Sequence, residues 1–481
     1  MLKKKFWALV MVLAMGASLL SACGGSTEKT PESAERTGDA VTLKWIQVGN
    51  AMPDNYESWL QQINPYLEEK IGVNIDIEVV SWGDWDSRRA IIVNSGEAFD
   101  ILFTDQNRYT AEVSTGAFLD ITDLVQEKTP ELYDMLPEDY WGAAKIDGQI
   151  YAVPTYKDSS ATQFFIWDNA VAREYGINVE EVTDYAKLHE ALKIIQEGEG
   201  GSPHYMSRNG ADFLVTGYFD QIGAGFPALG IKYNDETRTV VNPLADEELL
   251  ANMDIIHQMY LEGIINSDAP TADDSNKYRT FFTAQGWPGA APSTWGPDNG
   301  IDDCVAIQFG ETVVSNTTVR GSMNGISVNS EHPEKALEFL QLVNTDIKVR
   351  DWLYYGVEGE NFNYVDGKID KINSDWSMAG YTQGTFFELS ILTTDEGNPW
   401  EEVRAQNENA VPSVMLGFDL DISELTTELA NVNAVYEKYR YEYWTGAQEP
   451  RALVEAMQEE LDAAGYQTIL EAAQEQVNAF Q

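Results

Sequence analysis

The stretch VTLKWIQV, residues 41–48, is followed by NYESWLQQINPYLEEKIG, residues 55–72, and by NIDIEVV, residues 74–80. Apolar and polar side chains alternate in the first and third segments, which is the period of a β-strand. In the middle segment apolar residues recur at helical spacing, and Gly72 closes the pattern. The three segments therefore predict a strand, a helix and a second strand.

The same alternation of elements continues along the chain. DSRRAIIVNSGE, residues 86–97, predicts a helix, and DILFT, residues 100–104, predicts a short buried strand. This β-α-β-α-β order predicts a mostly parallel sheet, and ligands of such sheets bind beyond the carboxyl ends of the strands. The loops expected to matter most are GNAMPDN, residues 49–55, SWGDWD, residues 81–86, and TDQNRY, residues 104–109.

The N-terminus has the features of an export signal. Lysines at positions 3–5 precede a fifteen-residue apolar run, residues 6–20, which is shorter than the roughly 20 residues of a spanning helix. Leu20-Ser21-Ala22-Cys23 resembles the lipobox of bacterial lipoproteins, which implies cleavage before Cys23 and attachment of lipid to its thiol. We therefore expect a signal peptide over residues 1–22. The polar stretch over residues 23–39 predicts a flexible tether.

Composition narrows the class of ligand. The chain has 481 residues, 43% of them hydrophobic, and a formal net charge of −47. This charge excludes nucleic acid as a partner and favours neutral or cationic ligands. About 440 residues remain after the tether, which is too many for one compact core and fits two large lobes.

Three further stretches carry a resemblance to a known family. They are AFDILFTDQNRYTAEVSTGAFLDITDLV (98–125), KIDGQIYAVPTYKDSSATQFFIWDNAVAREYGI (145–177) and GSMNGISVNSEHPEKALEFLQLVNTD (321–346). In order and separation they resemble the family 1 type extracellular solute-binding proteins of carbohydrate ABC transporters. The chain from GFDLDISELTTELANVNAVYEKYRYEYWTG (417–446) to its end resembles the uncharacterised C-terminal domain of one lipoprotein branch of that family.

The resemblance implies an α/β fold of two lobes, each discontinuous in sequence, joined by hinge crossings around a ligand cleft, with a helical C-terminus. The N-terminal lobe would comprise residues 41–156 plus about 324–370. The C-terminal lobe would comprise about 157–323 plus 371–481. Pro154 between two apolar strands suits such a crossing between lobes, and closure would be a hinge motion.

Loop aromatic residues are the main candidates for ligand contact. The apolar face of a pyranose stacks on a flat ring, while carboxylates and amides bind its hydroxyls. Trp82 and Trp85, with Asp84 between them, form the best local case, although one of the two tryptophans could instead pack in the core. Trp295 is a third candidate, because neighbouring Gly and Pro residues fix the turn that carries it.

The resemblance adds further candidates for ligand binding. Hydrogen-bonding residues are expected after the strand DILFT and at the first crossing, where Lys157 and Asp158 could touch ligand or pair across the hinge. The segment GYFDQIGAGFP would supply an aromatic platform. The candidates added in this way are Asp105, Gln106, Asp158, Tyr218 and Phe226. Asn50, Tyr355 and Tyr381 are further candidates, each of which could instead be structural.

An enzyme is the main alternative class, because a secreted, acidic, aromatic-rich protein could be a glycosidase. Glycosidases use paired carboxylates, but among 78 acidic residues pairs arise by chance. There is no HExxH, GxSxG or DxDxDG pattern, and Cys304 reads as a small buried hydrophobe. No catalytic residue, metal or cofactor is therefore predicted, although a structural calcium ion stays open. A peptide or polyamine receptor is a third class, favoured by the charge.

The sequence thus predicts a monomeric lipoprotein at the extracellular face of the bacterial cytoplasmic membrane. It would capture an oligosaccharide and deliver it to the membrane permease of an ABC importer. Binding, rather than bond cleavage, would be its chemistry.

Overall fold

The computed structural model describes residues 40–223, 225–273, 278–395 and 397–480. The first five elements are β1 (Val41–Gly49), α1 (Tyr56–Ile71), β2 (Val73–Ser81), α2 (Trp85–Ser95) and β3 (Ile101–Thr104). The predicted β-α-β-α-β order is therefore confirmed. β1 pairs in parallel with both β2 and β3. Gly72, at a φ of 68°, lets the chain turn directly from α1 into β2.

The first sheet has the strand order β2-β1-β3-β12-β6. β12 (Met323–Ile326) runs antiparallel to β3 and to β6 (Ala152–Pro154), so the sheet is mixed. β1 is an interior strand and buries both of its faces: Leu43 and Trp45 lie in one hydrophobic cluster, whereas Ile46 and Val48 lie in another. The helices around this sheet include α3 (Tyr109–Ser114), α4 (Thr122–Lys128), α5 (Pro130–Met135), α6 (Glu138–Ala144), α13 (Pro333–Thr345) and α14 (Ile347–Tyr355).

The second sheet has the order β10-β7-β11-β15. β7 (Ala161–Asp168) pairs antiparallel with β10 (Phe281–Gln285) and β11 (Cys304–Val314), and β15 (Val411–Pro412) is parallel to β11. Phe165 and Trp167 of β7 face the large second core, whereas Phe164 and Ile166 face a smaller cluster. Cys304 is half-buried beside that smaller cluster.

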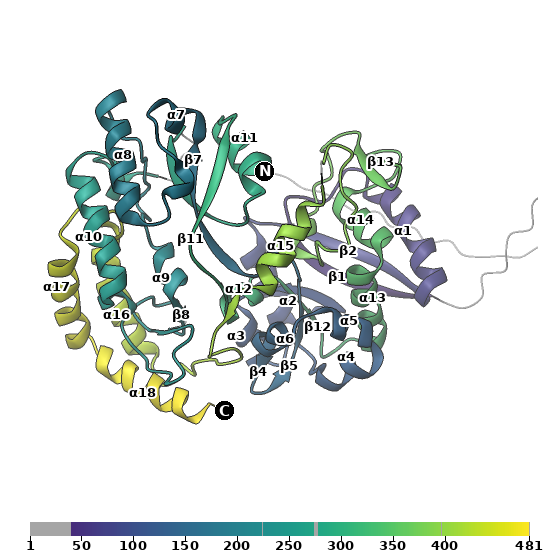
Figure 1. Ribbon diagram of the computed structural model, residues 1–481. Helices are drawn as coiled ribbons and strands as arrows, with labels where there is room; N and C mark the ends of the chain where they lie inside the picture. Colours follow the sequence, from purple (N-terminus) through teal and green to yellow (C-terminus); the bar gives the residue numbers. More distant parts are fainter. Residues whose placement is uncertain (1–39, 224, 274–277, 396, 481) are drawn as a thin grey trace, which may run out of the picture. The chain divides into compact units, whose positions relative to one another are not determined.

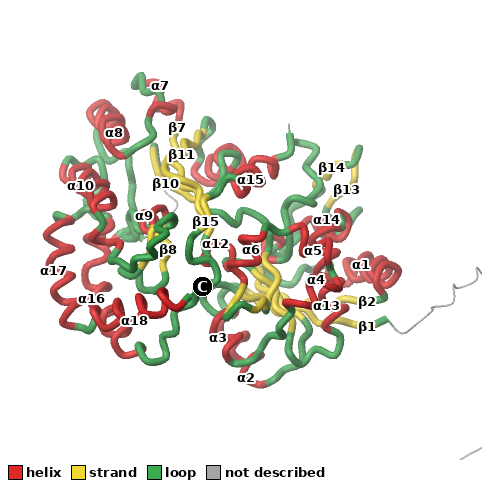
Figure 2. Tube along the Cα trace, turned by 60° about the horizontal axis from the view of Figure 1, so that its bottom comes forward, coloured by secondary structure: helices red, strands yellow, loops and turns green. Residues whose placement is uncertain are grey.

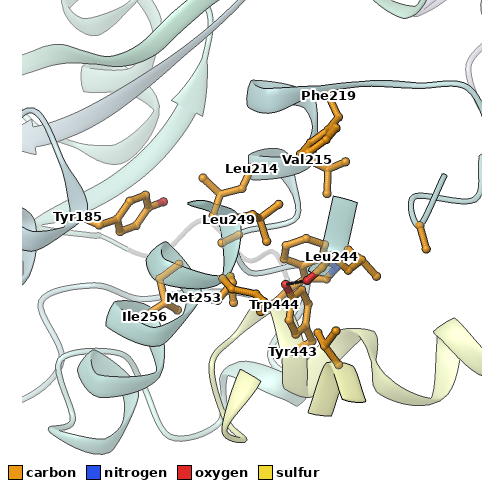
Figure 3. Packing of buried hydrophobic residues seen from close by; sticks show 14 of the residues in the cluster. Tyr185, Leu214, Val215, Phe219, Leu244, Leu249, Met253, Ile256, Tyr443 and Trp444 are labelled. Carbon is orange, nitrogen blue, oxygen red and sulfur yellow. Dashed lines mark hydrogen bonds between the residues drawn. The ribbon is translucent and has the colours of Figure 1, made fainter. Parts of the chain in front are cut away.

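Helices build most of the second core. They include α7 (Asn169–Glu174), α8 (Tyr185–Glu199), α9 (Phe213–Tyr218), α10 (Glu247–Leu261), α16 (Thr426–Trp444), α17 (Pro450–Ala463) and α18 (Tyr466–Ala479). Figure 2 shows α16, α17 and α18 grouped beside α10. In the core itself, the Tyr443 hydroxyl donates to the Leu244 carbonyl at 3.0 Å, next to Met253 (Figure 3). The helical C-terminus predicted from the sequence thus packs on the second sheet's helices.

Smaller elements complete the described chain. The short strands are β4 (Lys145–Ile146), β5 (Gln149–Ile150), β8 (Phe219–Gln221), β9 (Gly230–Lys232), β13 (Phe362–Val365) and β14 (Lys368–Lys371); the remaining α-helices are α11 (Gly296–Asn299), α12 (Asn316–Arg320) and α15 (Pro399–Glu408). In the view of Figure 1, α15 is drawn between β11 of the second sheet and the strands β1 and β2 of the first, and β15 follows α15 in the chain. Within the described ranges, no helix combines the length and apolar character needed to cross a membrane.

The two sheets are connected by three chain segments. One runs between β6 and β7, one contains α12, and the third is α15. Thr155 donates from its backbone N–H to the Ser322 carbonyl at 3.0 Å, which joins the first two segments. Asn407 of α15 donates to the Lys157 carbonyl and accepts from the Ser160 hydroxyl, which joins the third to the first.

The third connection differs from the predicted lobe boundary. Residues from 371 onward were expected in the C-terminal lobe, yet Met378, Phe386, Leu389 and Val403 pack in the core of the first sheet. The chain reaches the second sheet only at β15, after α15. The remaining lobe boundaries stay a prediction.

Candidate functional site

Two exposed aromatic rings lie side by side near the carboxyl end of β2. Trp82 follows β2 and is 48% exposed, and Tyr381, from a distant part of the chain, is 41% exposed. Their rings are parallel within 4° and their centroids are 6.4 Å apart. Burial raises the pKa of Tyr381, and the Trp82 side chain lowers it in part. We call Trp82 and Tyr381 the aromatic pair.

Asn50 lies close to the segment that carries Tyr381. It is exposed just beyond the end of β1, and its backbone N–H donates to the Ser377 carbonyl at 3.4 Å. The Ser377 hydroxyl donates in turn to the Ala51 carbonyl at 2.9 Å. The loop after β1 and the segment before Tyr381 are therefore joined.

The other residues of the SWGDWD loop have structural contacts. Asp84 is exposed and accepts from the Ser81 hydroxyl at 2.7 Å, which closes the turn before α2. Trp85 is only 4% exposed and packs edge-on against Phe103, with ring centroids 5.7 Å apart. Of the two loop tryptophans, Trp85 is thus the one that packs in the core.

Asp105 is held by a buried arginine. Arg89 is 2% exposed; its guanidinium donates to Asp105 at 3.2 Å and forms two hydrogen bonds with Glu112. Asp105 also accepts from the Asn107 backbone N–H at 2.8 Å, within the turn that follows β3. These contacts fix the turn, so Asp105 has a demonstrated structural role. The adjacent Gln106 is half-buried, and its side-chain oxygen has no hydrogen-bond partner among the described residues.

Asp158 shares a neighbour with the aromatic pair. It forms an ion pair with Lys157 at 2.6 Å on the connection between β6 and β7. Burial raises the pKa of Tyr354; the charge of Arg350 lowers it in part, and the charges of Asp158 and Tyr381 raise it. Tyr354 also packs against Gly380, the residue before Tyr381. The neighbouring Tyr140 hydroxyl is buried without a hydrogen-bond partner among the described residues.

The remaining predicted residues do not join this group. Phe226, expected to contribute to an aromatic platform for ligand, is instead fully buried among rings that include Tyr436 and Tyr466. Tyr355 is 9% exposed, and its hydroxyl donates to the Ser390 carbonyl at 2.9 Å, so its role in this structure is structural.

Two candidates belong to the second sheet's surroundings. The Tyr218 hydroxyl, at the end of α9, accepts from the Asn252 amide at 2.9 Å, and the side chain is half-buried. Trp295 is also half-buried and packs against Phe164 with ring centroids 6.0 Å apart. No contact among the described residues places either of them next to the aromatic pair.

Tyr354 and Gln383 were missed by sequence reasoning. Tyr354 lies within α14, where its spacing indicates only a packing residue. Gln383 is 2% exposed, and its side-chain oxygen has no partner within the described chain. No local sequence signal distinguishes either residue. Within the part of the chain that the structure describes, no three His, Cys, Asp or Glu side chains are grouped to hold a metal ion.

Comparison with known proteins defines the class. Residues 50–347 match the family model described as bacterial extracellular solute-binding protein, and residues 414–481 match a domain of unknown function. The chain therefore belongs to the bacterial extracellular solute-binding proteins, and the resemblance seen in the sequence is confirmed, including the C-terminal domain.

Particular relatives come from Streptococcus pneumoniae. A carbohydrate ABC transporter substrate-binding protein of the serotype 4 strain is 29% identical, over 99% of this chain and 98% of its own length. The crystal structure of the N-glycan transport solute binding protein NgtS superposes with a TM-score of 0.82 at 25% identity, covering 91% of this chain and 98% of NgtS. NgtS in complex with Man5GlcNAc gives a TM-score of 0.65, also at 25% identity, with 92% and 98% covered.

Proposed function

We propose that this protein captures an oligosaccharide at the aromatic pair and delivers it to the permease of an ABC importer. The observation that carries the proposal is the parallel pair of exposed rings, Trp82 and Tyr381, beyond the carboxyl end of β2. Exposed ring faces stack on the apolar faces of sugars. Asp158, whose charge acts on Tyr354 as that of Tyr381 does, offers a carboxylate that can accept hydrogen bonds from sugar hydroxyls.

The ligand we favour is a neutral oligosaccharide of mannose and N-acetylglucosamine. Its support is the likeness to NgtS, whose structure holds Man5GlcNAc. A neutral ligand also agrees with a formal charge of −47, which would repel anionic sugars. Asn50, Gln106, Tyr218 and Trp295 stay candidates for further ligand contacts.

Thermal unfolding of the soluble mature chain in the presence of a ligand panel tests the class of ligand. The panel contains high-mannose oligosaccharides, other neutral plant and microbial oligosaccharides, peptides and polyamines. A ligand at a hundred times its Kd stabilises the folded state by about 2.7 kcal/mol. We expect a rise in Tm with a neutral oligosaccharide, and the largest rise with the mannose-containing ones.

Two outcomes of the panel would redirect the assignment. Stabilisation by polyamines alone, falling steeply with salt, would favour a cation receptor, because screening weakens exposed charge interactions. Release of new reducing ends at catalytic rates would favour a glycosidase.

We further propose that Cys23 carries a lipid anchor, with residues 24–39 as the tether. Both lie outside the described residues. A tether to the membrane raises the effective concentration of the protein, as a monomer, near its permease. Replacing Cys23 with serine is expected to move the protein from the membrane fraction to the medium, measured by fractionation and immunoblotting, with sugar affinity unchanged. Continued membrane retention of the C23S variant would contradict the lipobox.

A further inference from the structure

Tyr381 lies on a very short element. It is the middle residue of a three-residue 3₁₀ turn, Gly380–Thr382. A turn of this length forms few hydrogen bonds of its own, so it does not by itself fix the direction of an exposed side chain. The surrounding segment, residues 378–385, is instead held by buried polar side chains from other elements.

Asn324 of β12 supplies the first set of contacts. Its amide nitrogen donates to the carbonyls of Thr382 and Gln383 at 3.2 and 3.3 Å. Its side-chain oxygen accepts from the Trp45 indole at 3.1 Å and from the Gln47 amide at 2.7 Å. Two donors face the oxygen and two carbonyls face the nitrogen, so the orientation of this amide is fixed by its partners. Asn324 is only 2% exposed.

Gln47 and Arg350 hold the same segment at other points. The Thr382 hydroxyl lies 2.9 Å from the Gln47 side-chain oxygen and 2.7 Å from the Ala379 carbonyl, so its single hydrogen is shared between these two acceptors. Arg350 is fully buried, and its guanidinium donates to the carbonyls of Thr385 at 2.6 Å and Gly380 at 2.5 Å. Carbonyls on both sides of Tyr381 are therefore bound by side chains that project from β12 and α14.

Such polar groups are costly in a core unless they are paired. The amides of Asn324 and Gln47 have partners, whereas Nη1 of Arg350 has none among the described residues. A buried donor or acceptor left without a partner costs about 1–3 kcal/mol, whereas apolar residues of similar shape carry no such requirement. Met323 and Ile326, on the same strand as Asn324, are buried hydrophobes. The arrangement fixes the backbone of the turn relative to β1, and β2, which precedes Trp82, pairs with β1 along its whole length.

We propose that Asn324 and Gln47 are positioning residues: their hydrogen bonds hold the Gly380–Thr382 turn so that Tyr381 stays parallel to Trp82 before ligand arrives. The inference rests on the proposed function, because it assigns these residues a part in the same site. Holding the rings in place before binding removes an ordering cost that would otherwise reduce affinity. Loss of this preorganisation is expected to weaken oligosaccharide binding by about three- to tenfold.

Four variants separate positioning from folding. Asn324→Leu removes all four hydrogen bonds of the amide. Thr382→Val removes only the hydroxyl, with its contacts to Gln47 and to the Ala379 carbonyl, at nearly constant volume. Thr382→Ser keeps that hydroxyl and serves as the conservative rescue. Asn266→Leu is the matched control, because Asn266 is a buried amide that bonds both backbone atoms of Met206 in the second core, far in the fold from the turn.

The readouts are calorimetric affinity and ¹⁹F NMR of protein labelled with 5-fluorotryptophan, with the Trp82 signal assigned from a Trp82→Phe variant. We expect Asn324→Leu and Thr382→Val to shift or broaden the Trp82 signal and to weaken affinity. Thr382→Ser and Asn266→Leu should change neither. If Asn324→Leu fails to fold, Thr382→Val decides the question.

The proposal is overturned if folded Thr382→Val keeps the wild-type Trp82 signal and an affinity within twofold of wild type. It is likewise overturned if Asn266→Leu shifts that signal as much as Thr382→Val does. The NMR readout needs no ligand. If the wild-type protein binds no oligosaccharide but the Asn324→Leu and Thr382→Val variants still change the Trp82 signal, the proposed function is refuted and the positioning role is retained.

Discussion

Replacing Asp419 with alanine is expected to lower the free energy of unfolding by about 3–5 kcal/mol, because it leaves a buried cation without its counter-charge. Arg320 of α12 has a side chain that is 1% exposed, and it binds both carboxylate oxygens of Asp419, at 2.6 and 2.9 Å. Its other donors reach the carbonyls of Ala143 at 2.7 Å and Lys145 at 2.9 Å. The same carboxylate accepts from the Thr110 hydroxyl at 2.7 Å.

This ion pair ties three parts of the chain together. Asp419 lies in the C-terminal domain of unknown function, Arg320 lies on a connection between the sheets, and Thr110 lies on α3 beside the first sheet. The domain is thus joined to the rest of the protein by buried charge as well as by its apolar packing. Loss of the ion pair would therefore weaken the attachment of this domain to the rest of the protein.

Urea unfolding followed by circular dichroism measures the effect of Asp419→Ala. Glu424→Ala is the matched control, since Glu424 is an exposed acid in the same segment and its removal changes the net charge equally. The control should stay within about 0.5 kcal/mol of wild type. If the free energy of unfolding of the Asp419→Ala protein lies within 1 kcal/mol of the wild-type value, the buried pair contributes little to stability.

Removing both rings of the aromatic pair is expected to weaken oligosaccharide binding by roughly 10- to 100-fold. Each aromatic contact contributes about 0.5–1.5 kcal/mol beyond its buried area, and about 1.4 kcal/mol corresponds to a tenfold change in Kd. The Trp82→Ala/Tyr381→Ala variant should keep wild-type stability, because both rings are among the exposed hydrophobic residues. Isothermal titration calorimetry gives the two Kd values.

Tyr278 provides the control for this variant. It is 54% exposed, and its hydroxyl donates to Asp168 at the end of β7, away from the first sheet. Tyr278→Ala removes a ring of similar exposure and should leave affinity unchanged. Equal affinities for the double variant and wild type would remove the aromatic pair from the binding site.

The fold of the first sheet follows from local periodicity. Over residues 41–104 the apolar residues recur either at every second position or at helical spacing. The first spacing is typical of strands and the second of helices, so the type and order of the elements could be predicted. The antiparallel pairing of β12 with β3 and β6 could not, because it joins segments far apart in sequence and no turn specifies it. The position at which the chain returns to the second sheet, at β15, could not be predicted for the same reason.

The two tryptophans of the SWGDWD loop show how far binding-site residues can be predicted from the sequence. The helix was predicted to begin at residue 86, whereas α2 begins at Trp85. Because α2 begins one residue earlier than predicted, Trp85 lies on the same buried helix face as Arg89 and Ile92, four and seven residues further on. Arg89 is a charged residue on that buried face and interrupts its apolar pattern. Its charge is paired inside the protein, and because this pairing is not visible in the sequence, the buried face could not be recognised.

The aromatic pair itself illustrates the remaining gap. Trp82 belonged, with Asp84 and Trp85, to the best local case in the sequence, whereas Tyr381 was named only among the further candidates. What brings them together is the set of buried side chains that bind the backbone around Tyr381, and these side chains come from β1, β12 and α14. Such contacts depend on the tertiary fold alone.

Calorimetric titration of the soluble mature protein with a mannose and N-acetylglucosamine oligosaccharide, followed by chromatography of the recovered sugar, tests the central claim most directly. The account predicts saturable binding at one site per chain, with the sugar recovered intact after prolonged incubation. Absence of heat and of Tm change with every neutral oligosaccharide in the panel, or recovery of cleaved sugar, would contradict it.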